Sequence, residues 1–151
     1  MWSFEHSIET NATPKRIWAL YSDVGKWPLW DAGISSITID GPFSAGSTGT
    51  ITPAGQDSLP YRLLAVDPEK GFSDQTELPG HEAVIRFIHS IDVLQSGKTR
   101  ITHRVEIDGN DADEVGSRIG SAFAKGVPET MCSLANMALH GADDRPQEPE
   151  E

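Results

Sequence analysis

The sequence of 151 residues predicts one α+β domain, in which a curved antiparallel sheet of about seven strands wraps around a long C-terminal helix. Short alternating apolar segments, separated by glycine and proline turns, fill residues 2–9 and 34–109 and are typical of antiparallel strands. Two short helical segments follow the first strand, and an apolar repeat of 3.6 residues runs from about residue 111 to residue 139. Because the strands have one wet face, the long helix is expected to cover the other.

The first strand is expected at residues 2–9, where apolar and polar side chains alternate. Thr13–Pro14 then predicts the start of a helix, because a hydroxyl side chain can cap the first turn and proline is tolerated at its first position. This helix is expected to end near residues 23–25. The side chains on the inward face of the first strand are Trp2, Phe4, His6 and Ile8.

A short helical turn is expected at residues 27–31, where two tryptophans flank a Pro–Leu pair. Tryptophan buries a large surface, and its N–H usually needs a hydrogen-bond partner. Two interpretations of Trp27 and Trp30 stay open. They form a hydrophobic plug that closes one end of the core, or they form an aromatic wall of a ligand cavity.

Strands and turns follow up to residue 109. The turn Gln95–Ser96–Gly97, with glycine at the expected left-handed position, predicts a hairpin between the two longest strands. Such a turn pairs residues whose numbers sum to 192, so His89 is expected opposite His103 with Cβ atoms about 5 Å apart. After an alternating segment around residues 37–43, the expected strands are residues 49–52, 61–66, 72–78, 83–94 and 98–108.

The long helix is expected from Asp111 to about Leu139, with Asp111 as part of its cap. About seven turns would span roughly 40 Å, and Pro128 predicts a kink. Three glycines inside the helix each cost about 1 kcal/mol relative to alanine, which indicates close approach of another element or room for something on that face. They are Gly116, Gly120 and Gly126, and the apolar stripe is Val115, Ile119, Phe123, Val127, Met131, Leu134 and Ala138.

The formal net charge of −11 argues against nucleic acid and anionic membrane surfaces as partners. No apolar segment approaches the ~20 residues that cross a bilayer, so no membrane insertion is expected, and the first residues lack the pattern of a secretory signal. Residues 1–141 are expected to form the domain. Residues 142–151, with five acidic side chains and one basic, are expected to form a disordered acidic tail.

A single cysteine, Cys132, excludes an internal disulfide and fits a reducing compartment. A cytoplasmic location is therefore expected. Because Cys132 falls in the long helix beside Met131, we interpret it as a buried, inert thiol, with a nucleophile as the alternative.

The order of the elements and four local motifs resemble the helix-grip arrangement of the START-like superfamily, which includes Bet v 1-like proteins and the polyketide cyclase/dehydrase and lipid-transport group. The resemblance covers residues 1 to about 141. It implies an interior cavity and a role in binding or transporting hydrophobic molecules, or in cyclase or aromatase chemistry; it carries no shared catalytic motif and implies no cofactor. Dimers are common among such proteins, so a homodimer is an open possibility. The motifs are the tryptophan-rich turn at 27–31, the glycine-bounded hairpin at 41–49, the last strand at 98–109, and Pro128 with Leu134–Ala135 in a kinked helix.

Three histidines are expected on the inward face of neighbouring strands: His89, His103 and, if the first strand pairs with the last, His6. Such a row could ligate a metal, serve as acid–base groups or polar ligand contacts, or be structural and hydrogen-bonded to one another, to water or to Tyr61. No carboxylate is expected to share the inward face with them, which weakens catalysis. We expect no metal and no cofactor.

The main functional hypothesis is binding of a small hydrophobic molecule in a cavity between the sheet and the long helix. The first alternative is a polyketide cyclase or aromatase-like enzyme in which His89 and His103 act as acid–base groups. The second is a regulatory or interaction protein whose cavity is filled by its own side chains. The candidate cavity residues are His6, Trp27, Trp30, Tyr61, Phe87, His89, His103, Gly116, Gly120, Phe123 and Val127.

Overall fold

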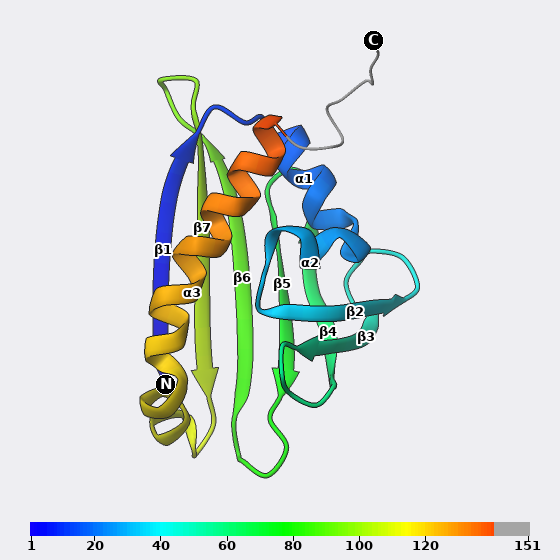
Figure 1. Cartoon of the computed structure of the whole chain (residues 1–151), viewed down its shortest axis with the longest axis vertical. Coiled ribbons are helices and arrows are strands. Elements are labelled where there is room, and N and C mark those ends of the chain that lie inside the picture. The colour runs from blue at the N-terminus through cyan, green and yellow to red at the C-terminus, as the bar shows by residue number, and fades with distance from the viewer. Residues whose placement is uncertain (141–151) are drawn as a thin grey trace.

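The computed structural model describes residues 1–140 (Figure 1) and confirms the predicted α+β class and helix-grip arrangement. The acidic tail predicted at residues 142–151 lies outside the described residues. The sequence did not predict the 3₁₀ turn between the short helices. In chain order the elements are β1 (Trp2–Thr10), α1 (Pro14–Ser22), the 3₁₀ turn (Val24–Lys26), α2 (Trp27–Trp30), β2 (Ile34–Asp40), β3 (Thr48–Pro53), β4 (Leu59–Asp67), β5 (Gly71–Glu77), β6 (Val84–Val93), β7 (Thr99–Asp108) and α3 (Ala112–His140).

The strands form one antiparallel sheet in the order β1-β7-β6-β5-β4-β3-β2. Strands that are consecutive in the chain are neighbours, and β1 returns to pair with β7. Gly97 adopts φ 89° in the turn between β6 and β7, and the resulting register places His89 opposite His103, as predicted. His6 lies opposite His103 on its other side. The alternation of side chains along each strand therefore brings the three histidines to one row on the inward face.

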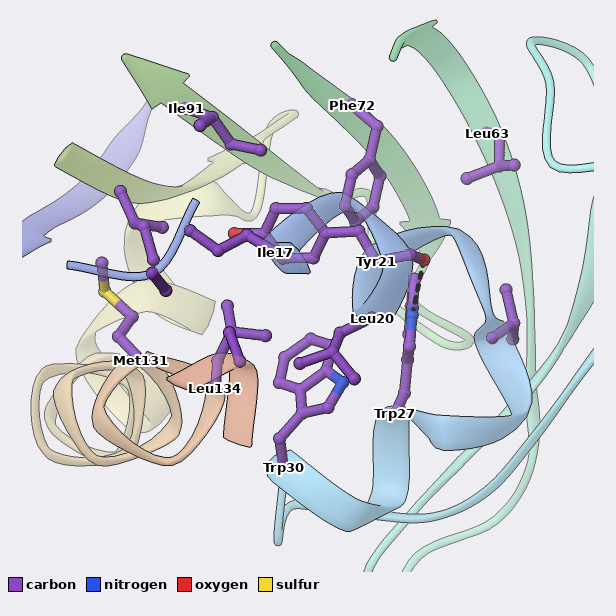
Figure 2. Close-up of a cluster of buried hydrophobic side chains, with 14 of the residues drawn as sticks. Ile17, Leu20, Tyr21, Trp27, Trp30, Leu63, Phe72, Ile91, Met131 and Leu134 are labelled. Atoms are coloured by element: carbon purple, nitrogen blue, oxygen red, sulfur yellow. Dashed lines mark hydrogen bonds between the residues drawn. The ribbon is translucent and has the colours of Figure 1, made fainter. Parts of the chain in front are cut away.

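The two short helices close one end of the sheet. The Thr13 hydroxyl accepts the N–H of Arg16 at 3.2 Å, and Pro14 occupies the first turn of α1, as predicted. The Trp27 indole N–H donates to the carbonyl of Tyr21 at 2.9 Å and so ties α2 to α1 (Figure 2). This end of the molecule is filled by side chains from α1, α2, α3 and the sheet.

The long helix α3 packs on β1 and β7 and reaches α1 and α2 beyond them (Figure 1). Its bounds agree with the prediction to within a residue at each end, and the kink at Pro128 stays a prediction. Asp111 directly precedes α3, and its carbonyl oxygen accepts the N–H of Val115 at 2.9 Å. Its carboxylate accepts the N–H of Glu82 at 2.7 Å, because the backbone before β6 passes beside the start of α3.

The glycines of α3 are explained by close approach of another element. An ideal Cβ at Gly116 would lie 2.4 Å from Cγ of Trp2, and one at Gly120 would lie 2.7 Å from Cζ2 of the same indole. Gly126, in contrast, has no atom within 4 Å of such a Cβ. The Trp2 side chain therefore occupies the space that the two glycines leave, and it fastens the first strand to the last helix.

Buried apolar side chains form two clusters at opposite ends of the β6–β7 pair, one around Ile91 and Ile101 and the other around Ile85 and Ile107. Val127 of α3 packs against both of them. We call the first the helical-end cluster, which includes Ile17, Leu20, Tyr21, Trp27, Trp30, Leu63, Phe72, Ile91, Ile101, Met131 and Leu134. We call the second the turn-end cluster, which consists of Ala83, Ile85, Val105, Ile107, Ala112 and Val115.

The expectation of a buried Cys132 is wrong, because this side chain is exposed. It follows Met131 directly on the helix, and Met131 is fully buried, so a step of one residue turns Cys132 toward solvent. Within residues 1–140, no helix is both long and apolar enough to cross a membrane.

The helical glycines provide a matched test of the Trp2 contact. Gly126→Ala should raise the free energy of unfolding by about 0.5–1 kcal/mol, since alanine is the better helix former and its methyl group meets open space. Gly116→Ala should instead lower it by about 1–3 kcal/mol, because the methyl group overlaps the Trp2 indole. Urea unfolding monitored by far-UV circular dichroism measures both changes. A stabilising effect of Gly116→Ala would contradict the packing of Trp2 on α3.

Candidate functional site

A row of polar side chains crosses the inward face of the sheet beside Tyr21 of α1. Tyr21 is fully buried, and its hydroxyl lies 2.7 Å from Nε2 of His103. The His103 ring lies 4.6 Å from the ring of His89, edge to face. His103 is only 7% exposed, whereas His6 and His89 are half-buried. The predicted row is therefore present, and Tyr21 is a member of it that the sequence analysis missed.

His89 is held by the strand beside it. Its ring stacks on Phe72 of β5 at a centroid distance of 4.0 Å, and its Nδ1 lies 3.3 Å from the carbonyl oxygen of Phe72. A carbonyl oxygen can only accept a hydrogen bond, so Nδ1 carries the hydrogen in this contact. The other ring nitrogen of His89 is then an acceptor.

Both inner histidines are held in the neutral form. Burial lowers the pKa of His89 to about 4, with the contact to Phe72 acting in the opposite direction. Burial lowers the pKa of His103 well below its usual value, and the neighbouring His89 and His6 lower it further. Burial also raises the pKa of Tyr21, so its phenol keeps its proton. The hydrogen bond between this hydroxyl and Nε2 of His103 therefore joins two neutral groups.

The expectation that no carboxylate shares the inward face is wrong. Asp74 of β5 points inward between Leu63 of β4 and Phe87 of β6 and is 6% exposed. Burial raises the pKa of Asp74 to about 8, so the group is a neutral carboxylic acid at pH 7. The sequence did contain a signal for this placement. Asp74 lies two residues after Phe72 in the same strand, so the two side chains must lie on the same face of the sheet.

The other predicted polar and aromatic residues are mainly occupied in packing. The Tyr61 hydroxyl donates to the carbonyl of Thr38 at 2.7 Å, and burial together with Asp74 and Asp40 raises the pKa of Tyr61 to about 12. Trp27 and Trp30 are 5% and 3% exposed in the helical-end cluster, which favours the interpretation as a plug. The N–H of Trp30 is the one buried side-chain N or O atom in residues 1–140 without a hydrogen-bond partner.

Four inward-facing residues of β6 and α3 are half-buried: Phe87, His89, Phe123 and Val127. We call these four residues the central strip. Phe87, Phe123 and Val127 pack against the turn-end cluster, and Val127 also packs against the helical-end cluster. The rings of Phe87 and Phe123 lie 5.9 Å apart, edge to face, and connect the sheet to the helix. The other two helix candidates, Gly116 and Gly120, face Trp2 instead.

The best-defined hollows of the described surface lie away from the central strip. One, of about 380 Å³, lies between the turns at the start of β6 and the start of α3 and is lined by residues such as Leu78 and Asn110. The other, of about 760 Å³, lies beside Pro14 and the turn before β5. In residues 1–140, no three histidine, cysteine or acidic side chains are placed to hold a metal ion together.

A sheet closed by two short helices and gripped by a long C-terminal helix, with polar groups on an otherwise apolar inward face, defines a Bet v 1-like helix-grip protein. The chain belongs to the family described as polyketide cyclase / dehydrase and lipid transport, which matches residues 1–138. A comparison with curated protein sequences finds no match.

Solved structures with the same fold are distant in sequence. Norcoclaurine synthase from Thalictrum flavum shares 14% identity at a TM-score of 0.70, over 92% of this chain and 87% of that one. Ara h 8.0201 shares 16% identity at a TM-score of 0.67, over 91% and 97% of the two chains. A hypothetical protein of Helicobacter pylori shares 10% identity at a TM-score of 0.75, over 90% and 86%. Identities this low establish the fold alone.

The buried carboxyl of Asp74 predicts a specific pH dependence of stability. Its pKa rises from 3.8 in the unfolded chain to about 8 in the folded one, so its contribution to stability falls as pH increases between these values. The histidines act in the opposite sense, since their lowered pKa values remove stability as pH falls below about 6.5. Asp74→Asn removes only the first effect.

Wild type should therefore lose stability relative to Asp74→Asn by about 1.4 kcal/mol per pH unit between about pH 4.5 and pH 7.5. Urea unfolding at several pH values measures the difference. Thr76→Val serves as the control, because Thr76 is buried on the same face of β5 and does not titrate in this range. If the difference between wild type and Asp74→Asn does not vary with pH, Asp74 is not a buried neutral acid.

Proposed function

We propose that the chain binds a small hydrophobic molecule at the central strip, between the inward face of the sheet and α3. The observation that carries this proposal is the partial exposure of Phe87, Phe123 and Val127, which face inward beside the turn-end cluster. The family description, which includes lipid transport, supports the same class of ligand.

Apolar surface that faces the interior without being sealed is a source of binding energy. Its removal from water stabilises a complex by about 25 cal/mol per Å², and ligand sites are usually apolar with a few polar groups. The central strip has this composition, because His89 is its polar member and the carboxyl of Asp74 lies beside it, opposite Phe87. The helix α3 packs on β1 and β7, and its Phe123 reaches Phe87 of β6.

The second candidate is a regulatory or interaction protein whose interior is filled by its own side chains. It is favoured by the position of the best-defined hollows, which lie outside the central strip, and by Trp2, which occupies the space beside Gly116 and Gly120. In this case the strip closes on itself in solution, and the function lies on the outer surface.

The enzyme hypothesis has less support from the geometry. Nε2 of His103 is engaged by the Tyr21 hydroxyl, so His103 is not free to exchange a proton with a substrate through that nitrogen. The cytoplasmic location and the homodimer stay predictions.

Binding of the neutral fluorescent probe N-phenyl-1-naphthylamine tests the proposal. The emission of the probe should rise on binding to the wild type, and Val127→Phe should weaken binding by about tenfold or more, because the larger side chain fills the strip between the two clusters. Ala124→Phe is the matched control, since residue 124 is an exposed position of the same helix. Urea unfolding of both variants shows that they remain folded.

Native mass spectrometry of the protein purified from cells provides a second readout, because a bound hydrophobic molecule adds its mass to the chain. If wild type neither binds the probe nor carries a small molecule, the binding proposal is wrong. The second candidate, a regulatory or interaction protein with a filled interior, then takes its place. Equal weakening by both phenylalanine variants would move the site away from the central strip.

A further inference from the structure

Asp74 is a buried acid without a partner. Its carboxyl is 6% exposed, and no hydrogen bond joins it to any other side chain or backbone group in residues 1–140. A polar group buried in this way costs stability unless something satisfies it. Among the described residues, the N–H of Trp30 is the one fully enclosed side-chain N or O atom without a hydrogen-bond partner. The oxygens of Asp74 also lack a partner, so they are not fully enclosed.

His89 presents the complementary group. Its Nδ1 hydrogen is donated to the carbonyl of Phe72, so Nε2 offers a lone pair. No hydrogen bond engages Nε2 within residues 1–140. The stack on Phe72 and the edge contacts with Tyr21 and His103 fix the plane of the ring. The direction of this acceptor is therefore set before any ligand arrives.

The two groups are diagonal neighbours on adjacent strands. Phe72 pairs with His89 and Asp74 pairs with Phe87, so the side chains of Asp74 and His89 leave the same face with Cβ atoms about 7–8 Å apart. An oxygen atom between them can lie within about 3 Å of both groups, which is hydrogen-bond distance. The interior groups nearby are already paired, Tyr21 with His103 and Tyr61 with the carbonyl of Thr38.

We propose that Asp74 and His89 together recognise a hydroxyl group, and that the bound molecule is a small, uncharged hydrophobic compound with an alcohol or phenol. The hydroxyl oxygen accepts a hydrogen bond from the protonated carboxyl of Asp74, and the hydroxyl hydrogen is donated to Nε2 of His89. The apolar part of the compound lies against Phe87, Phe123 and Val127. This inference rests on the proposed function and names the ligand class for the same site.

The arrangement rejects related compounds for physical reasons. A methyl group in place of the hydroxyl leaves both protein groups unsatisfied, which costs about 1–3 kcal/mol for each. A carboxylate has no hydrogen for the acceptor on His89, and its charge would be buried without a cation among the groups named here. Neutral hydroxyl compounds are therefore selected over both.

Three naphthalenes substituted at the same carbon test the selection by displacing N-phenyl-1-naphthylamine: 2-naphthol, 2-methylnaphthalene and 2-naphthoate. Wild type should bind 2-naphthol about tenfold or more tightly than either of the other two. Asp74→Leu and His89→Leu should each bring the affinities for 2-naphthol and 2-methylnaphthalene to within about threefold of one another. Asp74→Asn keeps a donor at the same place and should retain the preference.

The outcomes separate this inference from the proposed function. Asp74→Leu is expected to fold, because residue 74 lies between Leu63 and Phe87, and urea unfolding verifies this. If wild type binds the probe but binds the three naphthalenes equally, or if Asp74→Leu keeps the preference, hydroxyl recognition is wrong and hydrophobic binding stands. If wild type binds none of the four compounds, the proposed function fails and this inference fails with it.

Discussion

The contact of Tyr21 with the sheet holds the helical end of the molecule together. The Tyr21 ring is fully buried and lies 5.0 Å from Phe72 and 5.4 Å from His89. Its hydroxyl binds His103, and its carbonyl accepts the N–H of Trp27. One residue thus joins α1 to α2 and joins both to strands β5, β6 and β7. The same contact buries the histidines, and burial is the main reason that they stay neutral.

A second anchor acts at the other end of the sheet, where Trp2 fills the space beside Gly116 and Gly120. Because α3 is fixed there and at α1, it lies along β1 and β7 instead of across the whole sheet. Each anchor completes a buried cluster, and Val127 touches both clusters. Phe87, Phe123 and Val127, which face inward beside these clusters, are only half-buried.

Local patterns predicted most of the fold and part of the site. The alternation of apolar residues and the three-residue turn before Lys98 determine the register, so the placement of His89 opposite His103 followed from the sequence. Contacts between distant segments did not follow in the same way. A glycine indicates that space is needed but not that Trp2, over a hundred residues earlier, takes it. Asp74 was missed because Phe72 is the one large apolar residue on the inward face of β5. The strand therefore shows no alternation of apolar and polar residues.

The hydrogen bonds of the interior bear on which chemistry it supports. An acid–base pair of histidines would need a free nitrogen on each ring in reach of one substrate. Nε2 of His103 is held by a phenol that keeps its proton, and His89 offers one acceptor with its other nitrogen bound to the backbone. The acceptor of His89 and the neutral acid of Asp74 are two groups on adjacent strands without a hydrogen-bond partner in residues 1–140. Such a pair satisfies a polar group of a ligand without either member changing its charge, which is the requirement of binding rather than of proton transfer.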